Sequence, residues 1–144
     1  MLHTHSRIWV HLIWATKNRE RILHKEQGIK LFNFLITKGK ELEIPFEKLN
    51  IQPEHVHGLI DIPTDKTVAD FMKMVKGSSS NMLNRNVFQS KFRWQRGYGA
   101  YSVSASQIDV VKNYIANQSA HHKKNTFADE YDAWIREYGL FDDK

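Results

Sequence analysis

The sequence of 144 residues contains no cysteine, only three prolines and seven glycines, and no long apolar run. Without cysteine, the fold can have no disulfide, no thiolate metal site and no thiol nucleophile. The apolar stretch at residues 8–14 is far shorter than the roughly 20 residues of a membrane helix. The first residues also lack the basic and apolar regions of a secretion signal. We therefore expect a cytoplasmic protein that makes no contact with a membrane.

Length and charge set two further limits. At roughly 100 to 200 residues per domain, residues 1–144 are expected to form a single domain. The formal net charge is +5 and the pI is about 9.4, which favours an anionic partner, nucleic acid first. The excess of positive charge is modest, so charge alone does not decide the function.

Four short segments have the apolar, β-branched or alternating pattern of strands. They are residues 7–15, the pair Leu49 and Ile51, residues 55–62, and the pair Tyr101 and Val103. Three further segments have apolar residues at helical spacing, and a fourth follows near the C-terminus. They are residues 25–43 with Phe32, Leu35 and Leu42, residues 67–85, a helix from Ser106 with Ile108, Val111 and Ile115, and a last helix with Phe127, Tyr131, Trp134, Ile135 and Tyr138.

Local signals place the helix ends. Pro45 ends the first helix, Thr67 with Asp70 predicts the N-cap of the second, and Ser106 predicts the cap of the third. Residues 77–80, a glycine and three serines, either weaken the second helix or let another segment approach it closely. Residues 86–98 have no clean period and predict a loop.

The order of elements is strand, helix, strand, strand, helix, strand and two further helices. This is the order of a ferredoxin-like split βαβ fold of the α+β class. We expect a four-stranded antiparallel sheet with helices on one face and two added C-terminal helices. A fold class does not give a function, so the function must be argued from particular side chains.

His55 and His57 lie on the third predicted strand, where alternate side chains share a face. Their Cα atoms would be about 6.6 Å apart, a spacing that lets both imidazoles bind one metal ion. Gly58 would leave room beside the pair. Two surface histidines without a ligand remain the alternative interpretation of such a pair. His11 on the first strand could approach them, although we favour a core histidine with a satisfied hydrogen bond.

Tyr114 and Gln118 are four residues apart in the third predicted helix and therefore share one side of it. A tyrosine hydroxyl can attack a phosphodiester and form a covalent phosphotyrosine, and a nearby metal ion makes this feasible. The amide oxygen of Gln118 could complete the shell of a metal that His55 and His57 hold. A solvated tyrosine at the edge of a helix is the alternative.

The second helix and the loop after it combine cations with aromatic rings. Cations follow phosphates and flat rings stack on unpaired bases, so this stretch predicts a binding surface for single-stranded DNA. The alternative is that Phe92 and Trp94 close the core while the cations stay solvated. The candidate DNA-binding residues are Lys73, Lys76, Arg85, Arg93, Trp94 and Arg96.

Taken together, these features resemble the single-tyrosine HUH transposases of prokaryotic insertion sequences, including relatives associated with repetitive extragenic palindromes. The resemblance covers most of the chain in order and omits only the last predicted helix. One departure is Glu54, because the family often has aspartate directly before the first histidine. The segments that carry the resemblance are residues 11–17, 54–59, 76–79, 94–98 and 114–118.

The resemblance implies that His55, His57 and Gln118 hold a divalent ion, Mg or Mn, although the donors suit zinc as well. It also implies that Tyr114 attacks single-stranded DNA beside a hairpin at an element's end, leaving a 5′-phosphotyrosine and a free 3′-hydroxyl. Attack by another 3′-hydroxyl rejoins the DNA, so no nucleotide cofactor is needed. The implied protein is a homodimer whose sheets join edge to edge and whose tyrosine helix can complete the partner's site.

Two other functions fit the same residues. The first is a catalytically silent module that binds single-stranded DNA or RNA, in which Tyr114 is incidental. The second is a small metal-dependent hydrolase that activates water with His55 and His57. Only the transposase interpretation requires the hydroxyl of Tyr114.

Overall fold

The computed structural model describes residues 4–88 and 91–118. Four strands form one sheet in which every neighbouring pair is antiparallel, in the order β2-β3-β1-β4. This is the ferredoxin-like strand order, so the predicted fold class is confirmed. The strands are β1 (Trp9–Ala15), β2 (Phe46–Ile51), β3 (His55–Asp61) and β4 (Gly99–Val103).

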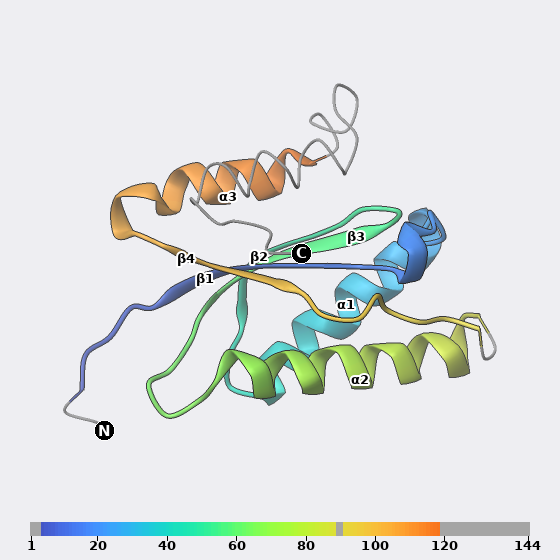
Figure 1. Cartoon of the computed structure of the whole chain (residues 1–144), viewed down its shortest axis with the longest axis horizontal. Coiled ribbons are helices and arrows are strands. Elements are labelled where there is room, and N and C mark those ends of the chain that lie inside the picture. Colours follow the sequence, from blue (N-terminus) through green and yellow to red (C-terminus); the bar gives the residue numbers. More distant parts are fainter. Residues whose placement is uncertain (1–3, 89–90, 119–144) are drawn as a thin grey trace.

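Helices cover both faces of the sheet. α1 (Lys25–Glu41) and α2 (Val68–Asn86) lie on one face, and α3 (Ile108–Ala116) lies on the other (Figure 1). Two short 3-10 turns, Lys17–Arg19 and Ala105–Gln107, follow β1 and β4. Because α3 carries Tyr114, the sheet separates this residue from α1 and α2.

None of the helices in the described part of the chain is long and apolar enough to cross a membrane.

The face under α1 and α2 holds the larger apolar core, here called the apolar face. Alternate residues of the two central strands point into it and are at most 7% exposed. Leu35 of α1 and Phe71 of α2 are among the residues that pack on them. The strand residues of the apolar face are Val10, Leu12, Trp14, Val56 and Ile60.

Several local predictions can be compared with the structure. Thr67 caps α2 as predicted, because its hydroxyl oxygen accepts a hydrogen bond from the backbone N–H of Asp70 at 3.1 Å. Ser106 does not cap α3. It lies inside the 3-10 turn, and Gln107 precedes the helix without a side-chain cap. Phe32 is 37% exposed, whereas Leu31 is fully buried, so the apolar stripe of α1 is rotated from the predicted one. The last predicted helix lies outside the described residues.

Candidate functional site

β3 places His55 and His57 side by side on the face of the sheet opposite the apolar face. Both side chains are fully buried, and their ring centroids are 4.8 Å apart at an interplanar angle of 76°. The predicted shared face is therefore confirmed, and the alternative of two surface histidines is wrong. Gly58 does not make room beside this pair. A Cβ atom at Gly58 would point to the apolar face and meet the ring of Phe46 at 2.8 Å.

His11 joins the two histidines from the neighbouring strand. β1 and β3 pair in a register that sets His11 opposite Leu59, so its ring lies diagonally beside His57 on the same face. Nε2 of His11 is 2.9 Å from Nδ1 of His57, and the two rings stack with centroids 5.1 Å apart. His11 is thus a buried core histidine with a hydrogen bond, as we favoured, and it also reaches the pair. We call His11, His55 and His57 the histidine cluster.

α3 places Tyr114 over the histidine cluster. Val111 and Ile115 are buried against the apolar residues that surround the cluster, and this contact fixes the helix on the sheet. The ring of Tyr114 then lies 5.7 Å from that of His57 and 6.3 Å from that of His11. A phenol and three imidazoles from segments far apart in the sequence are therefore brought together.

Gln118 follows Tyr114 by one helical turn and is fully buried. Its amide Nε2 donates to the backbone carbonyl of Tyr114 at 3.0 Å, while its Oε1 atom has no hydrogen-bond partner among the described residues. A buried carbonyl oxygen without a partner is costly unless something else binds it. No cluster of three histidine or acidic side chains in the described segments could hold a metal ion. Two imidazoles and this amide oxygen are nevertheless donors that fit a divalent ion.

Glu54, the departure from the family pattern, is 5% exposed at the start of β3. Its carboxylate lies 3.0 Å from the guanidinium of Arg21 and 3.4 Å from Nδ1 of His55. Burial raises the pKa of this carboxyl group, but contact with His55 and the charge of Arg21 outweigh burial and lower the pKa overall. The longer carboxylate therefore links the cluster to the loop after β1.

Trp94 does not belong to an exposed stacking surface. It is only 9% exposed, its ring packs at 5.9 Å from Trp14, and its indole N–H donates to the buried hydroxyl of Ser79 at 3.0 Å. Phe92 is buried as well, at 1% exposure. Phe92 and Trp94 therefore close the core, as the alternative interpretation proposed, and do not form an exposed surface for stacking on bases. The small residues of α2 allow this contact, because Ser79 accepts the indole where a larger side chain would fill the space.

The predicted cations divide into two groups. Lys73 and Arg85 are exposed on α2, which lies under the apolar face and away from the histidine cluster. Arg93 and Arg96 are exposed on the segment that borders the end of β1. Lys76 connects the two, because its ammonium group donates to the carbonyls of Gln95 and Gly97 at 2.9 and 2.7 Å. Burial lowers the pKa of Lys76.

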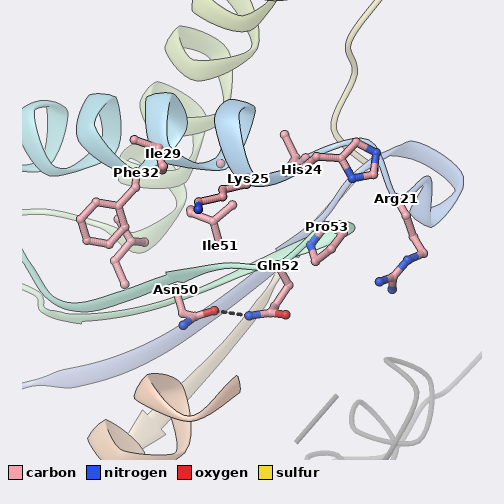
Figure 2. A pocket seen from close by; sticks show the side chains of 12 residues that line it. Arg21, His24, Lys25, Ile29, Phe32, Asn50, Ile51, Gln52 and Pro53 are labelled. Atoms are coloured by element: carbon pink, nitrogen blue, oxygen red, sulfur yellow. Dashed lines mark hydrogen bonds between the residues drawn. The ribbon is translucent and has the colours of Figure 1, made fainter. Parts of the chain in front are cut away.

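A groove of about 660 Å³ runs along β2, the strand at the sheet edge next to β3. The charged residues along it are all basic, and Ile29 and Phe32 of α1 form its apolar side (Figure 2). Asn50 and Gln52 project to the opposite side of the sheet, where their side chains hydrogen-bond to each other at 2.5 Å (Figure 2). The basic residues are Arg21, His24 and Lys25.

The Asn50–Gln52 pair was not among the predicted site residues. Asn50 lies opposite His57 in the register of β2 and β3, and the N–H of Gln52 donates to the carbonyl of His55 at 2.8 Å. The alternation of side chains at residues 49–52 could have revealed this pair. Since Leu49 and Ile51 face the apolar core, Asn50 and Gln52 must face the histidines.

Comparison with known proteins identifies the family to which the chain is similar. The family model for IS200-like transposases matches residues 4–118. The ISDra2 transposase TnpA of Deinococcus radiodurans is 26% identical over 114 residues, which cover 75% of this chain and 81% of that protein. The transposase for insertion sequence element IS200 of Salmonella typhimurium is 26% identical over 129 residues, covering 85% and 84%.

Two solved structures have a fold similar to that of this chain. A crystal structure assigned to a transposase of Deinococcus radiodurans R1 has a TM-score of 0.68 at 25% identity, covering 82% of this chain and 95% of that one. A REP-associated tyrosine transposase bound to a REP hairpin has a TM-score of 0.61 over 85% of this chain and 74% of that one, and at 15% identity it shows a shared fold alone. With the family match over residues 4–118, these findings show that the chain belongs to the IS200-like transposases, insertion-sequence transposases of the single-tyrosine HUH family.

Proposed function

We propose that this transposase cuts and rejoins single-stranded DNA through a covalent bond between Tyr114 and a 5′-phosphate. The observation that carries the proposal is the position of Tyr114, whose ring lies 5.7 Å from His57 in a cluster of three buried imidazoles. A tyrosine with only a packing role would not need imidazoles beside it. Family membership supports the transposase role, and the geometry supports this tyrosine as its nucleophile.

In the first step, the phenolic oxygen of Tyr114 bonds to the scissile phosphorus as the bond from phosphorus to the 3′-oxygen breaks. The tyrosine gives up its proton and the departing 3′-oxygen takes one up, so the DNA is left with a free 3′-hydroxyl. In the second step, the 3′-hydroxyl of another strand attacks the same phosphorus and releases Tyr114. One phosphoester replaces another in each step, so no nucleotide cofactor is required.

His55, His57 and Gln118 would hold a divalent metal ion in this site. The donor atoms fit, because the two imidazoles are adjacent and Oε1 of Gln118 has no hydrogen-bond partner among the described residues. When bound, Mg or Mn would neutralise negative charge on the phosphoryl oxygens. The hydrogen bond from Gln118 to the Tyr114 carbonyl ties the amide to the helix of the nucleophile.

We propose that DNA enters over the end of the sheet where β1 stops and β3 starts. Ala15 pairs with His55 there, and the backbone N–H of Lys17 donates to the Arg93 carbonyl at 3.0 Å. The segment after β1 and the segment that contains Arg93 both carry exposed cations at this end, and such cations suit contact with phosphates. We call these residues the basic end, and they are Lys17, Arg19, Arg21, Arg93 and Arg96. The REP hairpin bound by the structurally similar transposase supports a hairpin with a flanking single strand as the substrate.

The proposal includes a homodimer, and β2 and β4 are the two edge strands of the sheet that the described residues form, where two sheets can join. In this chain Tyr114 already lies over its own His57, so we expect each site to work within one chain. Mixing Tyr114→Phe with His57→Ala subunits tests this point. No recovered cleavage would agree with sites inside one chain, whereas recovered cleavage would indicate sites shared between subunits.

The deciding experiment incubates the protein with labelled hairpin DNA from the flanks of its gene, with Mn²⁺ or Mg²⁺, and separates the products on a denaturing gel. We expect a protein-linked DNA band that disappears with Tyr114→Phe and with a chelator. Cleavage that persists in Tyr114→Phe without such a band would favour metal-activated water. Binding without any cleavage of the correct end sequence would favour the silent binding module.

A further inference from the structure

We infer that Tyr98 stacks on an unpaired base of the single strand, close to the phosphate that Tyr114 attacks. The inference deepens the function proposed above and rests on its substrate, single-stranded DNA. It assigns a role to an aromatic ring that belongs to neither the apolar core nor the histidine cluster. Every base has a flat face, so a ring of this kind holds a strand without reading its sequence.

Tyr98 differs from the neighbouring aromatic residues in its exposure. Its exposed fraction is 40%, whereas the other aromatic rings of residues 91–103 are buried. Within these residues, Tyr98 is therefore the ring that a base can reach. Covering its face with a base removes apolar surface from water, which favours the contact. The buried rings are those of Phe92, Trp94 and Tyr101.

Hydrogen bonds fix the backbone that carries Tyr98. The ammonium group of Lys76 donates to the carbonyls of Gln95 and Gly97, at 2.9 and 2.7 Å. From the turn after β1, the backbone N–H of Asn18 donates to Oε1 of Gln95 at 3.0 Å. On the other side of Tyr98, β4 begins at the next residue. The backbone is thus already ordered before DNA binds, which lowers the entropic cost of stacking on the ring.

The sheet sets Tyr98 level with the proposed metal ligands. Ile13 of β1 pairs with His57 on one side and with Gly99 on the other. Since neighbouring strands lie about 4.8 Å apart, the backbones of Gly99 and His57 are about 10 Å apart across the sheet. Tyr98 directly precedes Gly99, on the side of the basic end. A strand that is bound at Tyr114 and extends over the basic end therefore runs towards this ring.

The charges around Tyr98 suit the same ligand. Three exposed cations precede it, and none of the residues 91–98 is acidic. The N–H of Lys17, another residue of the basic end, donates to the Arg93 carbonyl. Cations that contact phosphates beside a ring that stacks on bases form the combination with which proteins hold single strands. The three cations are Lys91, Arg93 and Arg96.

The test measures binding apart from chemistry, with Tyr114→Phe protein and a chelator, so that no strand is cut. The DNA is the hairpin from the flanks of the gene with its single-stranded extension, in which 2-aminopurine replaces one unpaired base at a time. Stacking quenches the fluorescence of 2-aminopurine. We expect quenching at an unpaired base that flanks the bond cleaved by wild type. Tyr98→Leu should abolish this quenching and weaken binding about 5- to 150-fold.

Three controls separate stacking from other roles of Tyr98. Tyr98→Phe keeps the ring without its hydroxyl and should retain both the quenching and the affinity. Phe32→Leu removes a ring of similar exposure, 37%, from α1 and should change neither. With a fully paired extension, whose bases have no free face, Tyr98→Leu should bind as tightly as Tyr98 protein. An equal loss of affinity for paired and unpaired extensions would indicate a structural role and overturn the inference.

The inference and the proposed function can fail separately. Quenching that persists in Tyr98→Leu, or an equal loss of affinity in Tyr98→Leu and Tyr98→Phe, would overturn the inference even if wild type forms protein-linked DNA. Conversely, quenching that depends on Tyr98 in a protein that forms no covalent product would support stacking and contradict the role of Tyr114. If the Tyr114→Phe protein does not bind the single strand, the substrate class fails and the inference fails with it.

Discussion

The two faces of the sheet bury different kinds of side chain, although the same two strands supply both. Towards α1 and α2, β1 and β3 present apolar residues such as Leu12 and Val56. Towards α3 they present His11, His55 and His57, all fully buried. A buried imidazole costs free energy unless its nitrogens are satisfied, and a buried leucine does not. We therefore expect the apolar face to carry most of the stability, and the histidine face to be maintained for chemistry.

Among the predicted changes in stability, the largest is expected for Leu12→Ala on the apolar face. Leu12 is fully buried, and its loss should lower the free energy of unfolding by about 2–5 kcal/mol, measured by urea denaturation. Because Leu12 points away from the cluster, Mn²⁺ affinity of the folded variant should match wild type. A folded Leu12→Ala protein that no longer binds Mn²⁺ would show that the two faces are not separable.

Metal binding should stabilise the protein through the histidine face alone. At 100 times the dissociation constant, Mn²⁺ should raise the free energy of unfolding by about 2.7 kcal/mol, and a chelator should reverse the gain. His55→Ala should abolish the gain, while Leu12→Ala should keep it, since distant changes add independently. Equal stabilisation of wild type and His55→Ala would place the metal elsewhere.

Substitution of Trp94 tests whether this aromatic residue belongs to the core or to the DNA-binding surface. Trp94→Phe removes the indole donor to Ser79 and should cost about 0.5–1.5 kcal/mol of stability. It should leave the affinity for single-stranded DNA unchanged, because the ring is in the core. Arg93→Ala should do the reverse, with unchanged stability, weaker DNA binding and a shallower salt dependence in fluorescence anisotropy. Weaker DNA binding by a stable Trp94→Phe protein would return Trp94 to the DNA surface.

The sequence was sufficient for the fold because its signals were local. The alternation in residues 55–62 put His55 and His57 on one face, and Thr67 with Asp70 marked the start of α2. Contacts between distant segments were not predictable in the same way. The hydrogen bond between His11 and His57 depends on the register of β1 and β3, which no periodicity encodes, because the two residues are 46 positions apart in the sequence.

The roles of aromatic residues were the least predictable part of the site. Trp94 has cations on both sides in the sequence, which is typical of a DNA surface, yet it packs on Trp14. The determining feature was the small Ser79 of α2, whose fully buried hydroxyl receives the indole. Only the three-dimensional arrangement shows that these residues meet.

The smallest expected effect concerns Lys76, which ties α2 to the segment that leads into the basic end. Burial lowers its pKa below the ordinary value of 10.5, so between that lowered pKa and 10.5 the unfolded chain binds more protons than the folded one. Raising the pH through this range therefore favours the folded state. The stability of wild type relative to Lys76→Met should increase from neutral pH towards 10.5, as followed by denaturant unfolding. Lys73→Met, an exposed lysine on the same helix, controls for removing a charge. A constant difference across this pH range would mean that the pKa of Lys76 is the same in the folded and the unfolded chain, and that burial of its ammonium group does not lower it.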